Sequence, residues 1–400
     1  MAMRAARRDF LTQACWIALA GALPPALVAA ESRHSALSVW ILRGGLDGLA
    51  AVPAWGDPDY AATRAALALG APSRAGGVLD LDGHFGLHPS LTNLHGLYQA
   101  GELLPMHAVA TAYRERSHFD GQKILENGTS SAAVTSGWLN RVLAAAGGPN
   151  AMAISSSVPL MLRGAAKVGS WAPSELPDPE PDTLDRIADL YAPDALLSAR
   201  LAEALAAREL VADAQPGSAG LARRNGPQYL SVLAQAAGRF MREPDGPVIT
   251  ALEIDGWDTH ANQGAAIGQL ANRLAGLDAA VAAFRQALGP RWSDTALLIV
   301  TEFGRTAAPN GTGGTDHGTA GMALLAGGAV NGGRVIADWP GLSRRALYQQ
   351  RDLEPTLDLR AACKGVLADH LSISIGVLNE EVFPDSARVP AARDLIRHRA

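Results

Sequence analysis

Acids, histidines and one serine form four short clusters in this 400-residue chain, each of them after an apolar run. The clusters occupy residues 44–48, 116–120, 255–260 and 315–318. In a parallel α/β sheet, ligands bind in the crevice beyond the carboxyl ends of the strands, where such clusters would lie. Because Asp and His are ligands for zinc and other divalent metals, the pattern predicts a metal site more directly than it identifies a reaction.

Two clusters contain an acid and a histidine that can turn toward one cation. Asp316 and His317 are adjacent in a glycine-rich loop. Asp258 and His260 are alternate residues of an extended segment, so their side chains point the same way. We expect all four to be metal ligands. The alternatives are a turn aspartate beside a surface histidine, and a helix N-cap at Asp258.

A third cluster places Ser117 at the start of a predicted helix, where free N–H groups and the helix dipole favour an anion. We expect Ser117 to be a nucleophile, because a metal can lower the pKa of its hydroxyl, and Arg116 to hold the anion. The alternative is a capping box formed by Ser117 and Asp120. The fourth cluster supplies Asp47, either as a first-strand metal ligand or as a turn residue beside Gly48.

Glu302 and Arg305 follow another apolar run. Glu302 could be a ligand, but we interpret it as a structural partner of Arg305 in a salt bridge.

These clusters must be positioned by strands that alternate with helices. Apolar runs predict strands at residues 36–42, 103–111, 151–155, 248–254, 295–301, 320–326 and 334–337. Periodic segments predict helices at residues 117–126, 137–146 and 263–288, with a helical insert at about 183–242. Continuous apolar strands indicate a mostly parallel sheet covered on both faces. We expect one α/β domain over residues 31–400.

The first thirty residues have the pattern of a twin-arginine signal peptide. Arg7 and Arg8 form the motif, an interrupted apolar stretch follows, and small residues end at Ala30. We therefore expect export by the twin-arginine translocase to the periplasm or beyond. The alternative, a membrane-anchoring N-terminus, is disfavoured by the short, broken apolar run.

The composition of the mature chain argues against several classes of protein. Removing residues 1–30, which carry three Arg and one Asp, changes the net charge from −5 to −7, and no basic excess indicates nucleic acid. We expect no transmembrane segment in the mature chain, since no other apolar run is long enough. Cys363 is then the single cysteine, so neither an intramolecular disulfide nor a thiolate zinc site is expected.

The clusters, in this order, resemble a bacterial family called domain of unknown function 1501, whose members are commonly exported by the twin-arginine route. The resembling segments span nearly the whole chain: RRDFL, LRGGLDGL, FGLHPSL, RSHFDGQ, GWDTH, TEFGRT, GTDHG and DLRAACKGVLADHL. The family is similar to a distant branch of the alkaline phosphatase and sulfatase superfamily. That resemblance implies an α/β/α sandwich, one or two divalent metals at the strand ends, and a nucleophile at a helix start.

Carried over residue by residue, the resemblance matches Asp47 to the first-strand acid and Ser117 to the nucleophile. It matches Asp316 and His317 to an adjacent Asp-His pair. Asp258 and His260 match an acid-x-x-x-His pair in part, because their spacing is shorter. The sequence has neither the superfamily's late His-x-Gly ligand nor the sulfatase cysteine motif.

We therefore expect an exported hydrolase or transferase that uses a divalent metal (Zn, Mg, Mn or Ca). Its substrate would be an anionic small-molecule or polymer ester of phosphate or a related acid. The first alternative is a non-catalytic metal-binding or assembly protein with the same fold. The second is a metal-stabilised carbohydrate or polymer binder.

Overall fold

The computed structural model describes residues 35–173, 179–211 and 227–397. They divide into two compact units, an α/β body and a smaller helical unit that contains residues 179–211. The predicted signal peptide, residues 1–30, lies outside the described residues. Among the helices of the described ranges, none has the length and apolar character needed to cross a membrane.

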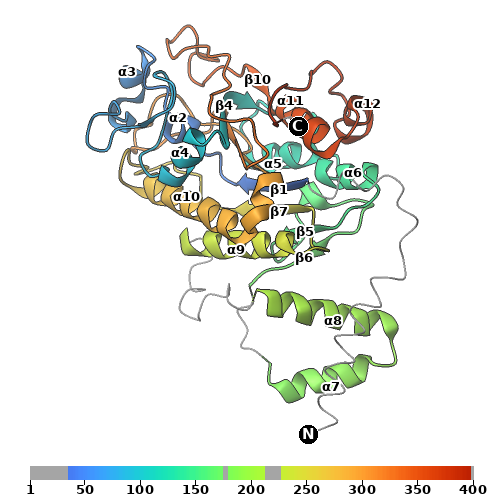
Figure 1. Ribbon diagram of the computed structural model, residues 1–400. Coiled ribbons are helices and arrows are strands. Elements are labelled where there is room, and N and C mark those ends of the chain that lie inside the picture. The colour runs from blue at the N-terminus through green and yellow to red at the C-terminus, as the bar shows by residue number, and fades with distance from the viewer. Residues whose placement is uncertain (1–34, 174–178, 212–226, 398–400) are drawn as a thin grey trace. The chain divides into compact units, whose positions relative to one another are not determined.

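An eight-stranded sheet forms the centre of the α/β body in the described part of the chain (Figure 1). Its strands are β1 (Ala36–Leu42), β4 (Leu103–Ala110), β5 (Ala151–Ile154), β6 (Gly169–Ser170), β7 (Ile249–Ile254), β8 (Thr295–Val300), β9 (Gly321–Ala326) and β10 (Leu357–Asp358). Their spatial order is β10-β4-β9-β8-β1-β7-β5-β6. Only the pairings of β9 are antiparallel, so the predicted mostly parallel sheet is confirmed. A separate small hairpin joins β2 (Leu79–Asp80) and β3 (Gly86–Leu87).

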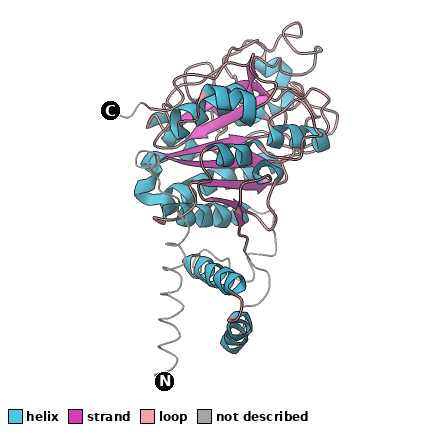
Figure 2. Cartoon of the chain, turned by 90° about the vertical axis from the view of Figure 1, so that its right-hand side faces the viewer, coloured by secondary structure: helices cyan, strands magenta, loops and turns pink. Residues whose placement is uncertain are grey.

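Helices cover both faces of the sheet (Figure 2). The body contains α2 (Gly48–Ala51), α3 (Tyr60–Arg64), α4 (Thr92–Gln99), α5 (His118–Asn127), α6 (Trp138–Ala145), α9 (Pro227–Arg242), α10 (Gln269–Leu288), α11 (Leu359–Leu371) and α12 (Ile375–Val377). Consecutive strand residues point to opposite faces. Val39 accordingly packs in a core with Val142 of α6 and Val366 of α11. The next residue, Trp40, meets Phe284 of α10 with ring centroids 5.5 Å apart. The expected α/β/α arrangement is therefore confirmed.

The register of the central strands brings their ends to one edge. Leu42 of β1 pairs with Ile254 of β7, and Ile41 of β1 pairs with Val300 of β8. The loops that follow these three strands therefore leave the sheet side by side. Because β9 is antiparallel to β8, the loop that leads into β9 at Gly321 reaches the same edge.

Two predicted elements differ from the observed ones. Residues 334–337 do not form a strand of the described sheet, because only Ile336 makes a single bridge, to Met106 of β4. Helix α10 begins at Gln269, not at residue 263. Gly264 and Gly268 precede it with φ angles of +77° and +133°, which break the helical backbone.

The predicted helical insert separates into two parts. Helix α9 belongs to the α/β body, where it packs along α10 and against β5 and β7. In the described residues, the helical unit contains α7 (Pro181–Tyr191) and α8 (Ala195–Leu210). Asp194 begins α8 as its N-cap, since its side chain accepts hydrogen bonds from the N–H groups of Leu196 and Leu197.

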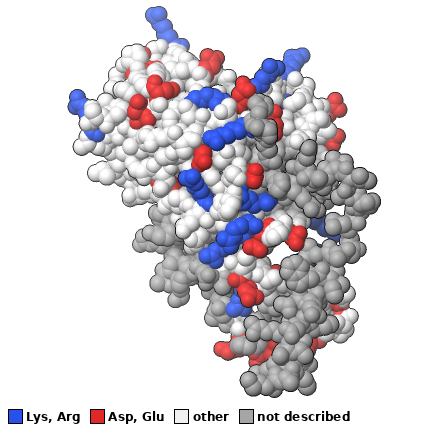
Figure 3. Space-filling model, in the orientation of Figure 1, with Lys and Arg blue, Asp and Glu red and all other residues white. Residues whose placement is uncertain are grey.

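Charges of both signs are mixed over the molecular face seen in Figure 3, where Lys and Arg side chains lie among Asp and Glu side chains.

Candidate metal centre

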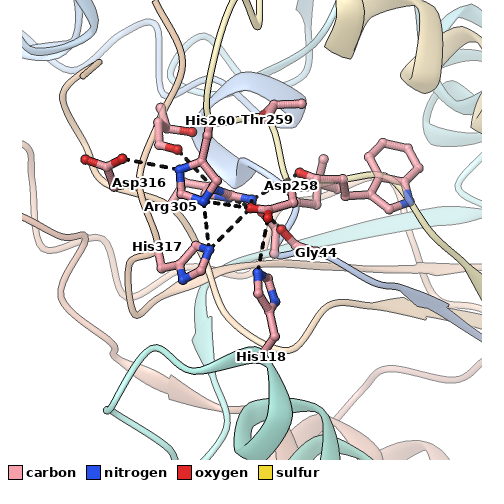
Figure 4. A network of polar contacts seen from close by, with 12 residues as sticks. Gly44, His118, Asp258, Thr259, His260, Arg305, Asp316 and His317 are labelled. Carbon is pink, nitrogen blue, oxygen red and sulfur yellow. Dashed lines mark hydrogen bonds and ion pairs between the residues drawn. The ribbon is translucent and has the colours of Figure 1, made fainter. Parts of the chain in front are cut away.

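Side chains from three segments converge at the carboxyl edge of the sheet (Figure 4). Asp258 and His260 follow β7, His317 lies in the loop between β8 and β9, and His118 is the first residue of α5. Ligand atoms of His118, Asp258 and His317 all lie within 4.8 Å of one another. Nε2 of His260 lies 3.0 Å from Asp258 Oδ1 and 2.9 Å from Nε2 of His317. The described residues therefore hold a possible His/Asp metal site.

Each of the three imidazole rings has its Nδ1 atom held by an oxygen that can only accept. The acceptors are the Glu302 carboxylate for His118 (2.8 Å), the Arg116 carbonyl for His317 (2.9 Å) and the Asp316 carboxylate for His260 (3.3 Å). The ring proton of a neutral imidazole is then on Nδ1, so Nε2 carries the free lone pair. Three such lone pairs point toward the carboxylate of Asp258.

The arrangement of donor atoms fits a divalent metal. The facing Nε2 lone pairs of His260 and His317 repel each other unless a cation or a shared proton lies between them. Nε2 of His118 is buried and has no hydrogen-bond partner among the residues described. Two ligand atoms about 2.0–2.1 Å from one tetrahedral ion are about 3.3 Å apart. The Nε2–Oδ distances from His317 and His118 to Asp258, 3.3 and 3.5 Å, are close to that spacing.

Glu302 is the buried carboxylate that orients His118. It also accepts hydrogen bonds from the N–H of Gly44 (2.8 Å), Nε2 of Gln122 (3.2 Å) and the hydroxyl of Thr301 (3.1 Å). Burial alone would raise the pKa of Glu302, but the hydrogen bonds, led by that from His118, lower it. The hydrogen bond to Glu302 in turn raises the pKa of His118. Glu302 therefore remains ionised and fixes the ring, as carboxylates behind metal-bound histidines do.

Arg305 ties the loops of the centre together. Its guanidinium is fully buried and contacts the carboxylate of Asp258. It also donates to the carbonyls of Gly45 (2.6 Å), Thr315 (3.0 Å) and Gly44. Partial burial would raise the pKa of Asp258, but Arg305 lowers it, so the carboxylate is ionised. Burial, the largest effect on His317, lowers the pKa of that ring and favours its neutral form.

Gly44 allows two of these loops to come together. Its φ angle is +119°, and a Cβ atom there would lie 2.5 Å from the backbone nitrogen of Asp258. A larger residue would therefore push the β1 loop away from the β7 loop.

The family described as "Protein of unknown function (DUF1501)" matches residues 81–380. The chain belongs to this family. No curated protein matches the chain at a significant level. Solved structures to which the DUF1501 chain is similar include the phosphonate monoester hydrolase of Agrobacterium radiobacter. The two chains are 12% identical, the match covers 85% of this chain and 74% of that chain, and the TM-score is 0.39. Another is the lipoteichoic acid synthase LtaP from Listeria monocytogenes. It is 9% identical, the match covers 94% of this chain and 81% of that chain, and the TM-score is 0.37.

Three of the predicted ligands of this DUF1501 chain, Asp258, His260 and His317, lie together in the centre. Asp316 lies behind His260, with one carboxylate oxygen accepting from Nδ1 of that ring and from the Asn310 side chain (3.0 Å). The Asn310 hydrogen bond is the main cause of the lowered pKa of Asp316. Asp316 is thus placed to orient His260.

Asp47 is not brought into this group. Its carboxylate is 1% exposed, forms an ion pair with Arg64 at 2.5 Å and accepts from Nε2 of Gln263 at 2.7 Å. Gln263 in turn accepts from the hydroxyls of Thr259 and Thr315. Asp47 therefore supports the two loops that carry the centre through Gln263. Its own carboxylate does not reach the centre.

Ser117 and Arg116 occupy the predicted helix start. Ser117 is the N-cap residue of α5, but its side chain makes no cap hydrogen bond within the described part of the chain. The capping-box alternative is therefore not observed. The Arg116 guanidinium is held by Asp352 (2.7 Å) and Gln349 (2.7 Å), while its backbone carbonyl holds His317.

His118 and Arg305 are residues of the centre to which the sequence patterns assign no role there. Glu302, considered from the sequence as a possible ligand, instead orients the ring of His118. The expected Glu302–Arg305 salt bridge is replaced by pairs of Glu302 with His118 and of Arg305 with Asp258. The available signal was a histidine next to Ser117 at a predicted helix start. Its partner could not be read from spacing, because Glu302 lies 184 residues away in the sequence.

Proposed function

We propose that this chain is an exported, metal-dependent hydrolase of phosphate or related esters. The observation that carries the proposal is the convergence of three imidazole Nε2 atoms with the Asp258 carboxylate. One of the three rings belongs to His118, which directly follows Ser117 in the sequence. Such a donor set suits zinc and similar divalent ions.

The protein's own residues would hold and orient the reacting groups. His118, His260, His317 and Asp258 would bind the metal, with their rings fixed by the oxygens behind them. The bound ion would supply neutralisation of the negative charge on the ester and a lower pKa for a nearby hydroxyl.

Ser117 is the proposed nucleophile. The first-turn N–H groups of α5 have no partner within the helix and favour an anion, so an ester bound there would lie beside the N-cap residue. Because the Ser117 hydroxyl is not used in a cap, it is available for reaction. In the proposed reaction it loses its proton and bonds to phosphorus, the alcohol leaves with a proton, and water then releases the acid.

Turnover assays test this proposal. The purified mature chain would be assayed against aryl phosphates, phosphodiesters and sulfates with Zn, Mg, Mn or Ca. We expect metal-dependent turnover that Ser117→Ala lowers by at least about a thousandfold, while Ser343→Ala, at an exposed serine, retains it. Absence of turnover with every metal, or full activity of Ser117→Ala, would contradict the nucleophile assignment.

One observation favours a second candidate, a metal-binding protein without catalysis. The guanidinium groups of Arg116 and Arg305, the arginines closest in sequence to site residues, are both engaged by protein acceptors. A hydrolase often uses such a group to hold its anion. Stoichiometric metal without turnover on any ester would support this candidate.

Export is tested separately by changing the twin arginines. We expect Arg7→Lys combined with Arg8→Lys to keep the protein in the cytoplasm as an uncleaved precursor, as measured by cell fractionation and N-terminal sequencing. Normal periplasmic accumulation of the double variant would overturn the twin-arginine route.

A further inference from the structure

Arg116 has a left-handed backbone just before the chain enters α5. Its φ angle is +60°, a conformation that a residue with a Cβ atom adopts rarely and keeps only where neighbouring groups hold it. In this conformation the Arg116 carbonyl accepts a hydrogen bond from Nδ1 of His317 at 2.9 Å. Because that carbonyl can only accept, the proton of the neutral ring lies on Nδ1 and the Nε2 lone pair faces Asp258. The backbone of Arg116 therefore orients one ring of the metal centre.

The side chain of Arg116 is bound by a turn at residues 348–352. Its Nε atom donates to Oδ2 of Asp352 at 2.7 Å, and Nη2 donates to Oε1 of Gln349 at 2.7 Å. The guanidinium carbon also lies 5.9 Å from the centre of the Tyr348 ring, within the range of a cation–π contact. The turn thus engages the guanidinium by two hydrogen bonds and one aromatic ring.

Asp352 is the charged partner of Arg116 in this turn, and its side chain is fully buried. The second carboxylate oxygen, Oδ1, accepts from Nη1 of Arg351 at 3.1 Å, so both oxygens are used. A buried charge is tolerated when it is paired in this way, and loss of one partner leaves the other uncompensated. Arg116 and Asp352 are 236 residues apart in the sequence, so their pair fixes the start of α5 on a distant segment.

The turn is also attached to the loop that carries His317. Asp352 forms a backbone bridge with Thr306, whose N–H donates to the Asp316 carbonyl at 2.9 Å. His317 is the next residue of the chain. The turn therefore reaches this ring by two routes, one through backbone pairing and one through Arg116.

We propose that Arg116 and Asp352 are positioning residues of the metal centre. Their ion pair holds the Arg116 backbone in place, so that its carbonyl fixes His317 for metal binding. The inference rests on the metal-dependent function proposed above. It gives Arg116 a role through its backbone carbonyl, where the sequence pattern suggests contact with the anion, and neither residue of the pair needs to touch the substrate.

Two substitutions at Arg116 separate the contribution of its backbone from that of its side chain. Both Arg116→Asn and Arg116→Val remove the guanidinium, but asparagine tolerates the left-handed conformation and valine does not. We expect Arg116→Val to weaken metal binding about 10–100-fold, as loss of a group behind a ligand does, and Arg116→Asn to weaken it less. Competition with a chelator of known affinity would measure both. Metal affinity of Arg116→Val equal to that of the parent chain would overturn the inference.

Asp352→Asn tests the buried partner, with Asp338→Asn at an exposed aspartate as the matched control. Nitrogen NMR of the isotope-labelled, metal-free chain would show which ring nitrogen of His317 carries the proton. We expect Nδ1 in the parent chain and the control, and a shift of population to Nε2 in Asp352→Asn and Arg116→Val. Weaker metal binding with the proton still on Nδ1 would reduce the pair to a structural role and overturn the inference. The Arg116 variants carry the test if Asp352→Asn does not fold.

The outcomes separate this inference from the proposed function. A shift of the His317 proton in the variants of a chain that binds no metal would support the positioning role and overturn the metal-dependent hydrolase. Metal-dependent turnover, with the metal affinity and the His317 proton unchanged in every variant, would support the hydrolase and overturn the positioning role.

Discussion

The Nε2 atoms of His260 and His317 lie 2.9 Å apart, although the Nδ1 atom of each ring faces an oxygen that can only accept. This arrangement puts two lone pairs against each other, and the Asp258 carboxylate lies 3.0 Å from the first and 3.3 Å from the second. A cation bound by all three groups removes the repulsion.

Glu302→Gln should weaken metal binding about 10–100-fold, because the amide no longer draws the proton of His118 to Nδ1 as a carboxylate does. Competition with a chelator of known affinity would measure the change. Glu381→Gln, at an exposed glutamate, is the matched control. Equal metal affinity of the two variants would show that Glu302 does not orient His118 for metal binding.

Ser117→Ala should change the free energy of unfolding by less than about 0.5 kcal/mol, because the hydroxyl makes no cap hydrogen bond in the described structure. Loss of a functioning N-cap costs about 1 kcal/mol. Asp358→Ala is the comparison, since Asp358 caps α11 through the N–H of Arg360. Urea unfolding would measure both, and a similar loss in the two variants would support the capping alternative for Ser117.

Asp47→Ala should destabilise the fold by about 3–5 kcal/mol, because it leaves the fully buried guanidinium of Arg64 without its carboxylate. The folded variant should still bind metal, since Asp47 lies behind the loops of the centre. Urea unfolding and metal analysis at low temperature would measure the two effects. Loss of metal with unchanged stability would instead make Asp47 a ligand, as the sequence pattern suggests.

Lowering the pH should destabilise the protein through His107, which is fully buried in β4. Burial lowers the pKa of His107 from 6.5 to about 4. Between these values the unfolded chain binds a proton that the folded chain does not. The free energy of unfolding therefore falls as the pH drops from about 6.5 to about 4, by roughly 3 kcal/mol in total.

Urea unfolding of His107→Gln across this pH range checks the effect. The variant should lose less stability than the parent chain as the pH falls, whatever its stability at pH 7. Parallel pH dependences of the two proteins would exclude His107 as a cause.

The strands were predictable because their residues are buried on both faces, as in β1, where every residue from Ala36 to Leu42 is buried. The antiparallel direction of β9 was not, since a buried apolar strand has the same composition in either direction. Asp258 and His260 were accessible to prediction because they follow the apolar run of β7 at alternate positions. The pairing of β7 with β1 then places them beside the loop after β1.

Residues whose roles depend on distant partners could not be assigned from spacing. His118 becomes a candidate ligand because α5 begins opposite the loop after β7, and Glu302 orients it from another strand end. Asp47 has the local sequence of a strand-end ligand, but Arg64 and Gln263 take its carboxylate. These pairings arise from tertiary packing.

Metal analysis of the mature chain, purified without chelators, tests the metal centre most directly. We expect about one divalent ion per chain, lost on Asp258→Asn or His317→Ala and retained on His95→Ala, since the His95 ring is hydrogen-bonded to the Asp80 carbonyl and is not among the residues of the centre. We also expect a chelator to lower the thermal unfolding temperature. A metal-free protein whose unfolding temperature is unchanged by chelator and by added zinc, magnesium, manganese or calcium would contradict the proposed centre.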